Sequence, residues 1–223
     1  MPDTYTGDVQ VGGPADTREL PGLTVTKIAV GDFDNNCYFL ECADTGEVLL
    51  VDAANEADRL LETLGDRHLA RVVTTHQHPD HWMALEAVVK ATGAPSTAHP
   101  LDAGPLPVKP TDLVEDGGTV TFGNVALRAI HLVGHTPGSI ALLYDAGGAL
   151  ADKPHLFTGD CLFPGGPGNT NKDQEAFTSL MDGLEEKVFG PLPDPTWIYP
   201  GHGKDSTLGA ERPHLQEWRA RGW

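Results

Sequence analysis

Four side chains of the kinds that bind divalent metals lie within six residues of one another in the segment Thr75-His76-Gln77-His78-Pro79-Asp80-His81. The segment follows an apolar run, so we expect it to leave the edge of a sheet in extended form. Side chains two apart on an extended segment project to the same side. The spacing therefore predicts that His76, His78 and Asp80 converge while His81 turns away, with the adjacent Asp80–His81 pair reaching a second ion. We interpret the stretch as half of a binuclear metal centre.

Three further candidate ligands, His135, Asp160 and His202, each stand where an apolar strand gives way to a glycine-containing turn. Glycine lets the backbone fold sharply and bring a side chain close to an ion. We therefore expect four separated corners of the chain to meet around two cations. In this assignment one metal is bound by His76, His78 and His135, the other by Asp80, His81 and His202, and Asp160 bridges both.

The predicted ligands are nitrogen and oxygen atoms, which suit Zn²⁺, although Fe or Mn also fits because the order of affinities alone does not decide occupancy. Cys161 is either a ligand in a distorted site or, as we expect of a neighbour on an extended segment, turned away from Asp160. Among the histidines without metal-like spacing, His131 is the candidate for supporting a ligand from behind. Asp52, at the end of an apolar strand, either braces the His76 loop or caps a helix or turn.

The strand-like segments come in two runs along the chain, and each run is followed by helix-like segments. We expect strands at 23–30, 36–41, 47–52, 71–75, 96–98, 125–133, 140–144, 155–157 and 196–199, a hairpin at 118–125, a glycine-rich loop at 164–168, and helices at 54–65, 82–92, 173–189 and 208–221. There is no strict alternation of single strands and helices, which favours two sheets facing each other with helices outside.

The 223 residues are most simply one domain, preceded by a polar lead-in at 1–22 that is either mobile or added to a sheet edge. The formal charge of −17 argues against nucleic acid as a partner. We find no apolar run of about 18 residues, so no membrane span is expected. The start of the chain shows no secretory signal, and its three cysteines form no C-x-x-C pair. We expect a cytoplasmic protein with a small-molecule substrate, and leave its oligomeric state open.

Four ordered motifs resemble the metallo-β-lactamase superfamily over about residues 23 to 210. They are His-x-His-x-Asp-His at 76–81, Gly-His-Thr-Pro-Gly-Ser at 134–139, Thr-Gly-Asp at 158–160 and Pro-Gly-His-Gly at 200–203. The resemblance implies an α/β fold, a four-layer αββα sandwich over residues 23–223, with the metals at one edge of the sheets. The segment Asp-Cys-Leu-Phe at 160–163, followed by Gly165–Gly168, is similar to compact single-domain relatives of glyoxalase II, which hydrolyse acyl thioesters of glutathione. A bridging Asp160 where some relatives have a zinc-binding cysteine argues against β-lactamase activity.

The chain departs from glyoxalase II where that family holds its substrate. A basic residue that helps hold glutathione is replaced by Asn169, and the family's helical C-terminal domain is not matched. Lys172 either substitutes for that basic residue or is a solvated lysine at a helix start. Trp82, which replaces a glycine-containing continuation, either narrows the mouth of the site or packs in the core. These departures affect the expected substrate rather than the metal chemistry.

The leading hypothesis is hydrolysis of a small thioester by a hydroxide held between the metals. The hydroxide is available near neutral pH because the cations lower the pKa of bound water to about 7. Asp80 binds metal and orients the hydroxide, and a thiolate leaves without a dedicated acid. One alternative is a persulfide dioxygenase with a single iron bound by His76, His135 and Asp160, because those enzymes share the scaffold. Others are hydrolysis of a lactone or lactam by the same hydroxide, and a metal-binding module without catalysis.

Overall fold

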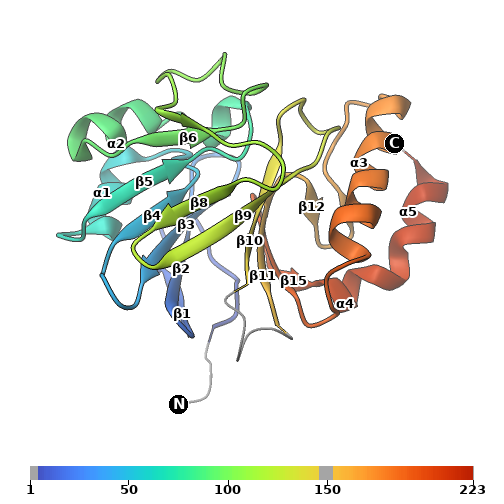
Figure 1. Cartoon of the computed structure of the whole chain (residues 1–223), viewed down its shortest axis with the longest axis horizontal. Coiled ribbons are helices and arrows are strands. Elements are labelled where there is room, and N and C mark those ends of the chain that lie inside the picture. The colour runs from blue at the N-terminus through green and yellow to red at the C-terminus, as the bar shows by residue number, and fades with distance from the viewer. Residues whose placement is uncertain (1–4, 146–152, 223) are drawn as a thin grey trace.

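The computed structural model describes residues 5–145 and 153–222, which form two facing sheets with helices on their outer sides (Figure 1). Across the first sheet lie β1 (Asp16–Leu20), β2 (Leu23–Val30), β3 (Asn35–Cys42), β4 (Val48–Val51), β5 (Leu69–Val73), β6 (Ser96–Ala98) and β7 (Asp112–Leu113). Across the second lie β15 (Ser206–Thr207), β14 (Trp197–Pro200), β11 (His155–Gly159), β10 (Ile140–Tyr144), β9 (Val125–His131) and β8 (Thr119–Phe122).

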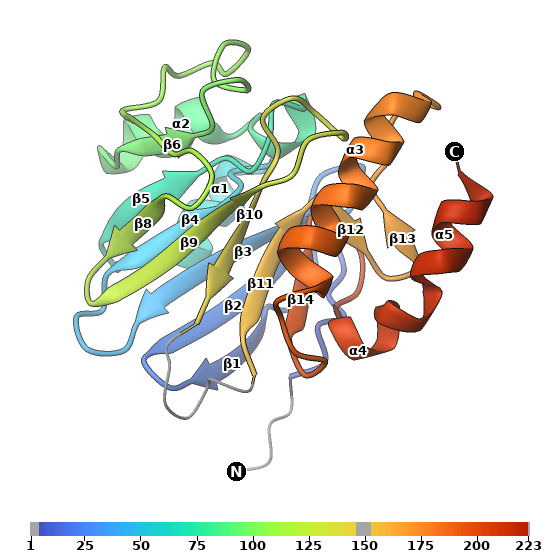
Figure 2. The same cartoon turned by 45° about the vertical axis from the view of Figure 1, so that its right-hand side comes forward.

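The helices cover the two outer faces, so the molecule has the four layers of an αββα sandwich (Figure 2). Against the first sheet pack α1 (Ala57–Leu64) and α2 (Leu85–Thr92), and against the second pack α3 (Gln174–Leu184), α4 (Leu208–Glu211) and α5 (Leu215–Arg221). A small hairpin, β12 (Leu162–Phe163) with β13 (Gly166–Pro167), lies between the second sheet and α5. The fold class expected from the sequence is confirmed.

Alternation along the strands explains why each sheet can be covered on both faces. In β3, Tyr38 and Leu40 are buried between the sheets, whereas Cys37 and Phe39 face the helices α1 and α2. In β10, Leu142 faces the space between the sheets and its neighbours face α3. Because successive side chains of a strand point to opposite faces, a strand that is apolar at every position is buried on both.

Three of the four strands that precede candidate ligands, β5, β11 and β14, run parallel to a neighbour, whereas β9 is antiparallel to both β8 and β10. In the first sheet β4 and β5 are parallel, with Val51 opposite Val73, and in the second β11 and β14 are parallel, with Gly159 opposite Pro200. The chain therefore leaves both sheets at one edge, immediately before the segments that hold the candidate ligands.

Several boundaries differ from those expected. The helices α1 and α2 begin three residues later than predicted, and Glu56 precedes α1 with φ 51°. The predicted last helix is divided by a 3₁₀ turn over Arg212–His214, because Pro213 cannot continue the hydrogen bonding of an α-helix. The predicted glycine-rich loop at 164–168 contains the turn and second strand of the β12–β13 hairpin, and β1, β7 and β15 were not predicted. The chain 1–22 thus contributes an edge strand, β1, although the division at residue 22 remains a prediction.

Within the described residues, no helix has both the length and the apolar character needed to cross a bilayer.

Candidate metal centre

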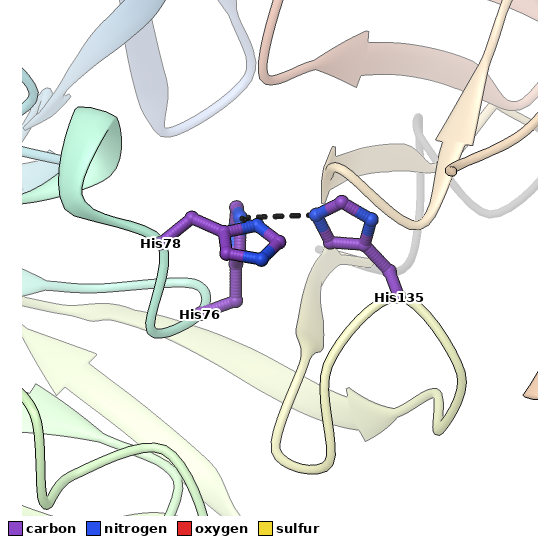
Figure 3. Close-up of side chains that lie close together, drawn as sticks. All are labelled: His76, His78 and His135. Carbon is purple, nitrogen blue, oxygen red and sulfur yellow. Dashed lines mark hydrogen bonds between the residues drawn. The ribbon is translucent and has the colours of Figure 1, made fainter. Parts of the chain in front are cut away.

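The first group of donors consists of three imidazoles, from His76, His78 and His135. Figure 3 shows them turned toward one another, two from the loop after β5 and one from the loop between β9 and β10. His76 Nε2 lies 3.0 Å from His78 Nδ1 and 3.2 Å from His135 Nε2. Their donor atoms lie within 4.8 Å of one another. These are the three residues that the sequence assigns to one metal.

The second group consists of Asp80, His81 and His202, as the sequence also assigns. His81 Nε2 is 3.2 Å from His202 Nε2, and Asp80 Oδ2 is 3.4 Å from the same His202 nitrogen. His202 enters from the loop after β14, more than a hundred residues along the chain. The donor atoms of this group also lie within 4.8 Å of one another.

Asp160 lies between the two groups. Its Oδ2 is 3.6 Å from His135 Nε2 and 3.4 Å from His202 Nε2, and its Oδ1 is 3.4 Å from His81 Nε2. Asp160 follows β11, beside β14, which brings its carboxylate to the meeting point of both sheets. All seven predicted ligands are therefore brought together, and their assignment to two metals is a proposal that this geometry supports.

The conformation of the His76–His81 segment differs from the prediction. The segment is not extended throughout, because Pro79–His81 forms a 3₁₀ turn. The turn separates Asp80 from His76 and His78, with which we expected it to converge, and groups it with His202. His81 does not turn away, since its ring centroid lies 4.1 Å from that of His76.

The donors have the character that a divalent cation requires. Asp160 Oδ1 is buried and makes no hydrogen bond. A Cβ on Gly201 would lie in van der Waals overlap with this oxygen, so glycine is the residue that lets the His202 loop approach so closely. Several imidazole nitrogens thus face each other at about hydrogen-bond distance, beside a buried carboxylate oxygen without a hydrogen bond. This arrangement suits binding of a shared cation better than hydrogen bonds between the imidazoles.

The pKa shifts differ among the imidazoles of the site, since that of His76 is lowered whereas, against the effect of burial, nearby carboxylates raise those of His81 and His202. Burial, with a contribution from His81, holds the pKa of His76 well below its usual value, which favours the neutral imidazole that binds metals. The hydrogen bond from His202 is the largest cause that lowers the pKa of Asp80. Burial lowers the pKa of His202, but hydrogen bonds to Asp160 and Asp80 outweigh it and raise the pKa to about 9. The two carboxylates that stabilise the positive charge of protonated His202 would also stabilise a metal cation at the same place.

The candidate ligands are oriented from behind through their other ring nitrogens. Asp52 Oδ2 lies 2.8 Å from His81 Nδ1, and Asp52 also accepts hydrogen bonds from the backbone N–H and the hydroxyl of Thr75. The bracing role considered for Asp52 is therefore correct. His135 Nδ1 lies 2.7 Å from the carbonyl oxygen of Asn169, and His202 Nδ1 lies 2.7 Å from that of Phe33. Such contacts select the tautomer and aim the opposite nitrogen at the centre.

A buried ion pair supports the His202 corner and was not predicted. Lys27 Nζ is fully buried and lies 2.7 Å from Asp205 Oδ1. The same ammonium donates to the carbonyl oxygens of Gly203 and Gly7, at 2.8 and 2.7 Å. Tyr5 donates its hydroxyl proton to Asp205. A lysine within an apolar strand pattern was the available signal, but its partner lies 178 residues away.

A second buried carboxylate joins the two loops of the imidazole group, and it too was not predicted. Asp102, in the loop after β6, accepts hydrogen bonds from the backbone N–H groups of Gln77 and Gly138, at 3.0 and 2.7 Å. It also accepts a hydrogen bond from the Thr136 hydroxyl at 2.5 Å. Gln77 lies between two candidate ligands and Thr136 follows another, so one side chain fixes both loops.

The structure also decides between the alternatives that the sequence left open for Cys161 and Trp82. Cys161 is buried among apolar side chains under α3, and burial raises its thiol pKa. It therefore points away from Asp160 and belongs to neither donor group. Trp82 packs against the core under α1 and α2 and donates its indole N–H to the carbonyl oxygen of Gln77, at 2.8 Å. It holds the histidine loop from its outer side.

Two other candidates lie outside the donor groups. His131 stacks on His99 with ring centroids 3.9 Å apart, and its Nε2 lies 2.8 Å from the carbonyl oxygen of Pro137. It contacts the loop of His135 rather than the ligand itself. Lys172 is exposed, as a solvated lysine would be.

Comparison with known proteins gives a consistent result. A family model described as the metallo-β-lactamase superfamily matches residues 30–202. The hydroxyacylglutathione hydrolase of Polaromonas sp. (strain JS666) is 32% identical over 188 residues, which cover 81% of this chain and 66% of that protein. Hydroxyacylglutathione hydrolase GloC of Haemophilus influenzae is 26% identical over 210 residues, which cover 85% of this chain and 95% of that protein.

Among solved structures, TTHA1623 in a di-iron-bound form superposes with a TM-score of 0.69 and 30% sequence identity. The superposition covers 83% of this chain and 96% of that chain.

Proposed function

This chain belongs to the metallo-β-lactamase superfamily, and we propose that it is a binuclear metal-dependent hydrolase of small acyl thioesters. The observation that carries the proposal is the pair of donor groups around Asp160, whose Oδ2 lies 3.6 Å from His135 Nε2 of the first group and 3.4 Å from His202 Nε2 of the second. Structural metal sites are usually closed shells of four protein ligands, whereas catalytic sites keep a position for water or substrate. Two groups of three side chains that share one carboxylate are of the second kind.

In this proposal the side chains divide into those that bind and those that orient. Two divalent cations, when bound, would supply a nucleophilic water near neutral pH and polarise the thioester carbonyl. His76, His78 and His135 would hold one cation, Asp80, His81 and His202 the other, and Asp160 both. Asp80 would also orient the attacking water, and Asn35 Nδ2, at 2.9 Å from Asp80 Oδ2, holds this carboxylate in place.

The leaving group favours a thioester over an amide. A thiolate departs without a proton at neutral pH, because thiol pKa values lie near 8.5. The described residues around the donors include no obvious additional proton donor, since the imidazoles and carboxylates are engaged as the contacts above describe. The hydroxyacylglutathione hydrolases among the relatives support the same substrate class.

Metal analysis together with a thioester assay tests this proposal. Full-length protein purified without added ions should contain two divalent ions per chain, which we propose are zinc. Removing them with a chelator should abolish hydrolysis of acetyl thioesters, and adding zinc back should restore it. One iron per chain together with oxygen uptake on a persulfide would instead support the dioxygenase alternative and overturn our proposal.

Two substitutions test the ligand assignment. His78→Ala should reduce metal content by one ion per chain, and Asp160→Ala should remove both, each with loss of turnover. His214→Ala is the matched control, because this exposed histidine lies outside the donor groups. Full activity in metal-free Asp160→Ala protein would contradict the assignment.

A further inference from the structure

A short hairpin forms one wall of a hollow of about 720 Å³ beside His202. The hairpin consists of β12 and β13, and its residues Phe163, Pro164 and Pro167 give the hollow apolar walls. The ring centroid of Phe163 lies 6.2 Å from that of His202. The position of the hairpin therefore determines how much room the hollow has next to this candidate ligand.

The tip of this hairpin depends on contacts from outside. β12 and β13 pair through two residues each, and an isolated two-stranded hairpin is at best marginally stable in water. Pro164 and Gly165 form the turn, and φ of Gly165 is +90°, which fits the third residue of a type II turn. Turns of that type do not follow the twist of the paired strands as the primed turns of most two-residue hairpins do. Other parts of the chain must therefore hold the turn.

Glu211, the last residue of α4, holds the turn from behind the hollow. It is buried, and its Oε2 accepts a hydrogen bond from the backbone N–H of Gly165 at 2.8 Å. Its Oε1 accepts one from the Ser206 hydroxyl at 2.5 Å, so both carboxylate oxygens are engaged. Arg221 of α5 donates to the carbonyl oxygen of the same Gly165 at 3.4 Å. The tip is thus attached to both helices beside it (Figure 2), and Glu211 itself does not line the hollow.

The base of the hairpin is fixed by other contacts. Gly168 donates its N–H to the carbonyl oxygen of Cys161 at 3.1 Å, and the Thr158 hydroxyl donates to that of Leu162 at 2.7 Å. Neither hydrogen bond involves α4 or α5. Release of the tip can therefore move the apolar wall of the hollow while the candidate metal ligands keep their places.

We propose that Glu211 is a positioning residue for the substrate, which acts through the Gly165 turn and does not touch the substrate. This inference rests on the proposed thioester hydrolysis. While the turn is held, the apolar wall stands where it can contact the organic group next to the thioester. When the turn is released, only a fraction of the molecules have the wall in place, and the apparent affinity falls by that fraction. Loss of Glu211 should therefore raise KM and leave kcat unchanged.

Two substrates of different size test this role. The benzyl group of S-benzyl thioacetate can extend from the metal centre into the hollow, whereas the methyl group of S-methyl thioacetate cannot. In zinc-loaded full-length protein, Glu211→Ala should raise KM for the benzyl substrate about tenfold, as expected for a lost hydrogen bond to a charged group. Its kcat, the metal content and kcat/KM for the methyl substrate should stay the same. An equal loss for both substrates, or a loss in kcat alone, overturns the inference.

Three variants separate the contact with Gly165 from general stability. Glu211→Gln keeps an acceptor for the Gly165 N–H and should retain the KM of the unmodified protein. Leu64→Ala opens a cavity in the core under α1 and should lower stability without a change in KM. Gly165→Ala keeps Glu211 but strains the turn, because a residue with a Cβ rarely adopts this φ, so it should raise KM for the benzyl substrate even if Glu211→Ala does not fold. The same KM in Leu64→Ala and Glu211→Ala overturns the inference.

Two measurements without turnover distinguish this inference from the proposed function. Hydrogen exchange of the Gly165 amide should be about tenfold faster in Glu211→Ala, and Glu211→Gln should restore its protection. The binding probe is 1-(benzylthio)propan-2-one, which cannot be hydrolysed because a methylene separates its sulfur from the carbonyl. Calorimetry on zinc-loaded protein should show that the probe binds Glu211→Ala about tenfold more weakly than the unmodified protein.

The outcomes differ for the two ideas. Binding that depends on Glu211, without turnover of any thioester, would refute thioester hydrolysis and keep the positioning role. Turnover with the same KM and the same probe binding in Glu211→Ala would refute the positioning role and keep hydrolysis. Neither turnover nor probe binding in the unmodified protein would overturn both.

Discussion

A histidine that binds a metal through one ring nitrogen is held in orientation by a hydrogen bond at the other. Here His81, His135 and His202 each have one ring nitrogen at 2.7–2.8 Å from a carboxylate or backbone oxygen. Each contact selects a tautomer and holds the ring plane, so that the opposite nitrogen is directed at the centre. Side chains next to candidate ligands in the sequence but without such contacts, such as Cys161, should not bind metal.

Cys161→Ala tests this expectation. The thiol lies in the apolar cluster under α3, so its removal should leave the metal content unchanged. The small cavity should cost about 1 kcal/mol of unfolding free energy. Elemental analysis and urea unfolding measure the two effects. A loss of metal comparable to that expected for His78→Ala would show that the sulfur is a ligand after all.

Lys27→Met should destabilise the protein strongly, by about 3 to 5 kcal/mol, because it leaves Asp205 buried without its cation. Burial raises the pKa of Asp205 and lowers that of Lys27, so both charges are costly where they lie. The double variant Lys27→Met/Asp205→Asn should therefore recover part of the loss. Urea unfolding measures both.

The exposed pair Lys204–Asp8 provides the control for this experiment. Lys204→Met should cost less than about 1 kcal/mol, because water screens an exposed ion pair. Equal losses in Lys27→Met and Lys204→Met would mean that burial of the Lys27 ammonium has no energetic consequence.

The loops between strands, more than the strands themselves, determine whether the centre can assemble. The loop after β6 supplies no candidate ligand, yet Asp102 in it accepts hydrogen bonds from the loop after β5 and from the loop between β9 and β10. These loops carry His76, His78 and His135. A carboxylate that satisfies three donors from two loops restricts both of them at once.

Asp102→Ala should therefore loosen the imidazole group. The unsatisfied N–H groups of Gln77 and Gly138 should cost about 3 kcal/mol of unfolding free energy. Metal affinity should fall about tenfold or more, as measured by competition with a chromogenic chelator. Asp66→Ala removes an exposed carboxylate and should change neither quantity. Unchanged metal affinity in Asp102→Ala would show that the two loops hold their positions without it.

The candidate metal centre lies at the edge of the sandwich where the two sheets meet. His76, His78, Asp80 and His81 follow a strand of the first sheet, whereas His135, Asp160 and His202 follow strands of the second. Cations shared by these residues would add to the hydrogen bonds that already join the two sheets there, such as those from Asn36 N–H to the carbonyl oxygen of Gly201 and from Ile140 N–H to that of Thr75. A ligand that binds the folded but not the unfolded chain stabilises the fold by mass action.

Removing the metals should therefore lower the urea midpoint of unfolding. With free zinc at a thousand times its dissociation constant, one site should contribute about 4 kcal/mol. His78→Ala, which lacks one donor, should show a smaller difference between metal-loaded and metal-free protein. Coincident unfolding curves with and without zinc in the unmodified protein would exclude the link between the sheets.

The identities of the candidate ligands could be predicted from local order along the chain. His76, His78, His81, His135, Asp160 and His202 each follow an apolar strand, and for all but His135 that strand runs parallel to a neighbour. The order of strand-like and helix-like segments likewise predicted two facing sheets with helices outside. Both patterns depend on residues that are close in the sequence, so they can be recognised without knowledge of the tertiary structure.

Contacts across long separations could not be predicted in this way. Lys27 and Asp205, Asp102 and Thr136, and Arg221 and Gly165 meet because two sheets and a terminal helix pack together, and such pairings leave no periodic pattern in the sequence. The 3₁₀ turn that directs Asp80 to His202 depends on the same packing. Strand ends and residue chemistry are local properties, whereas the partner of a buried charge is set by which surfaces the folded chain brings into contact.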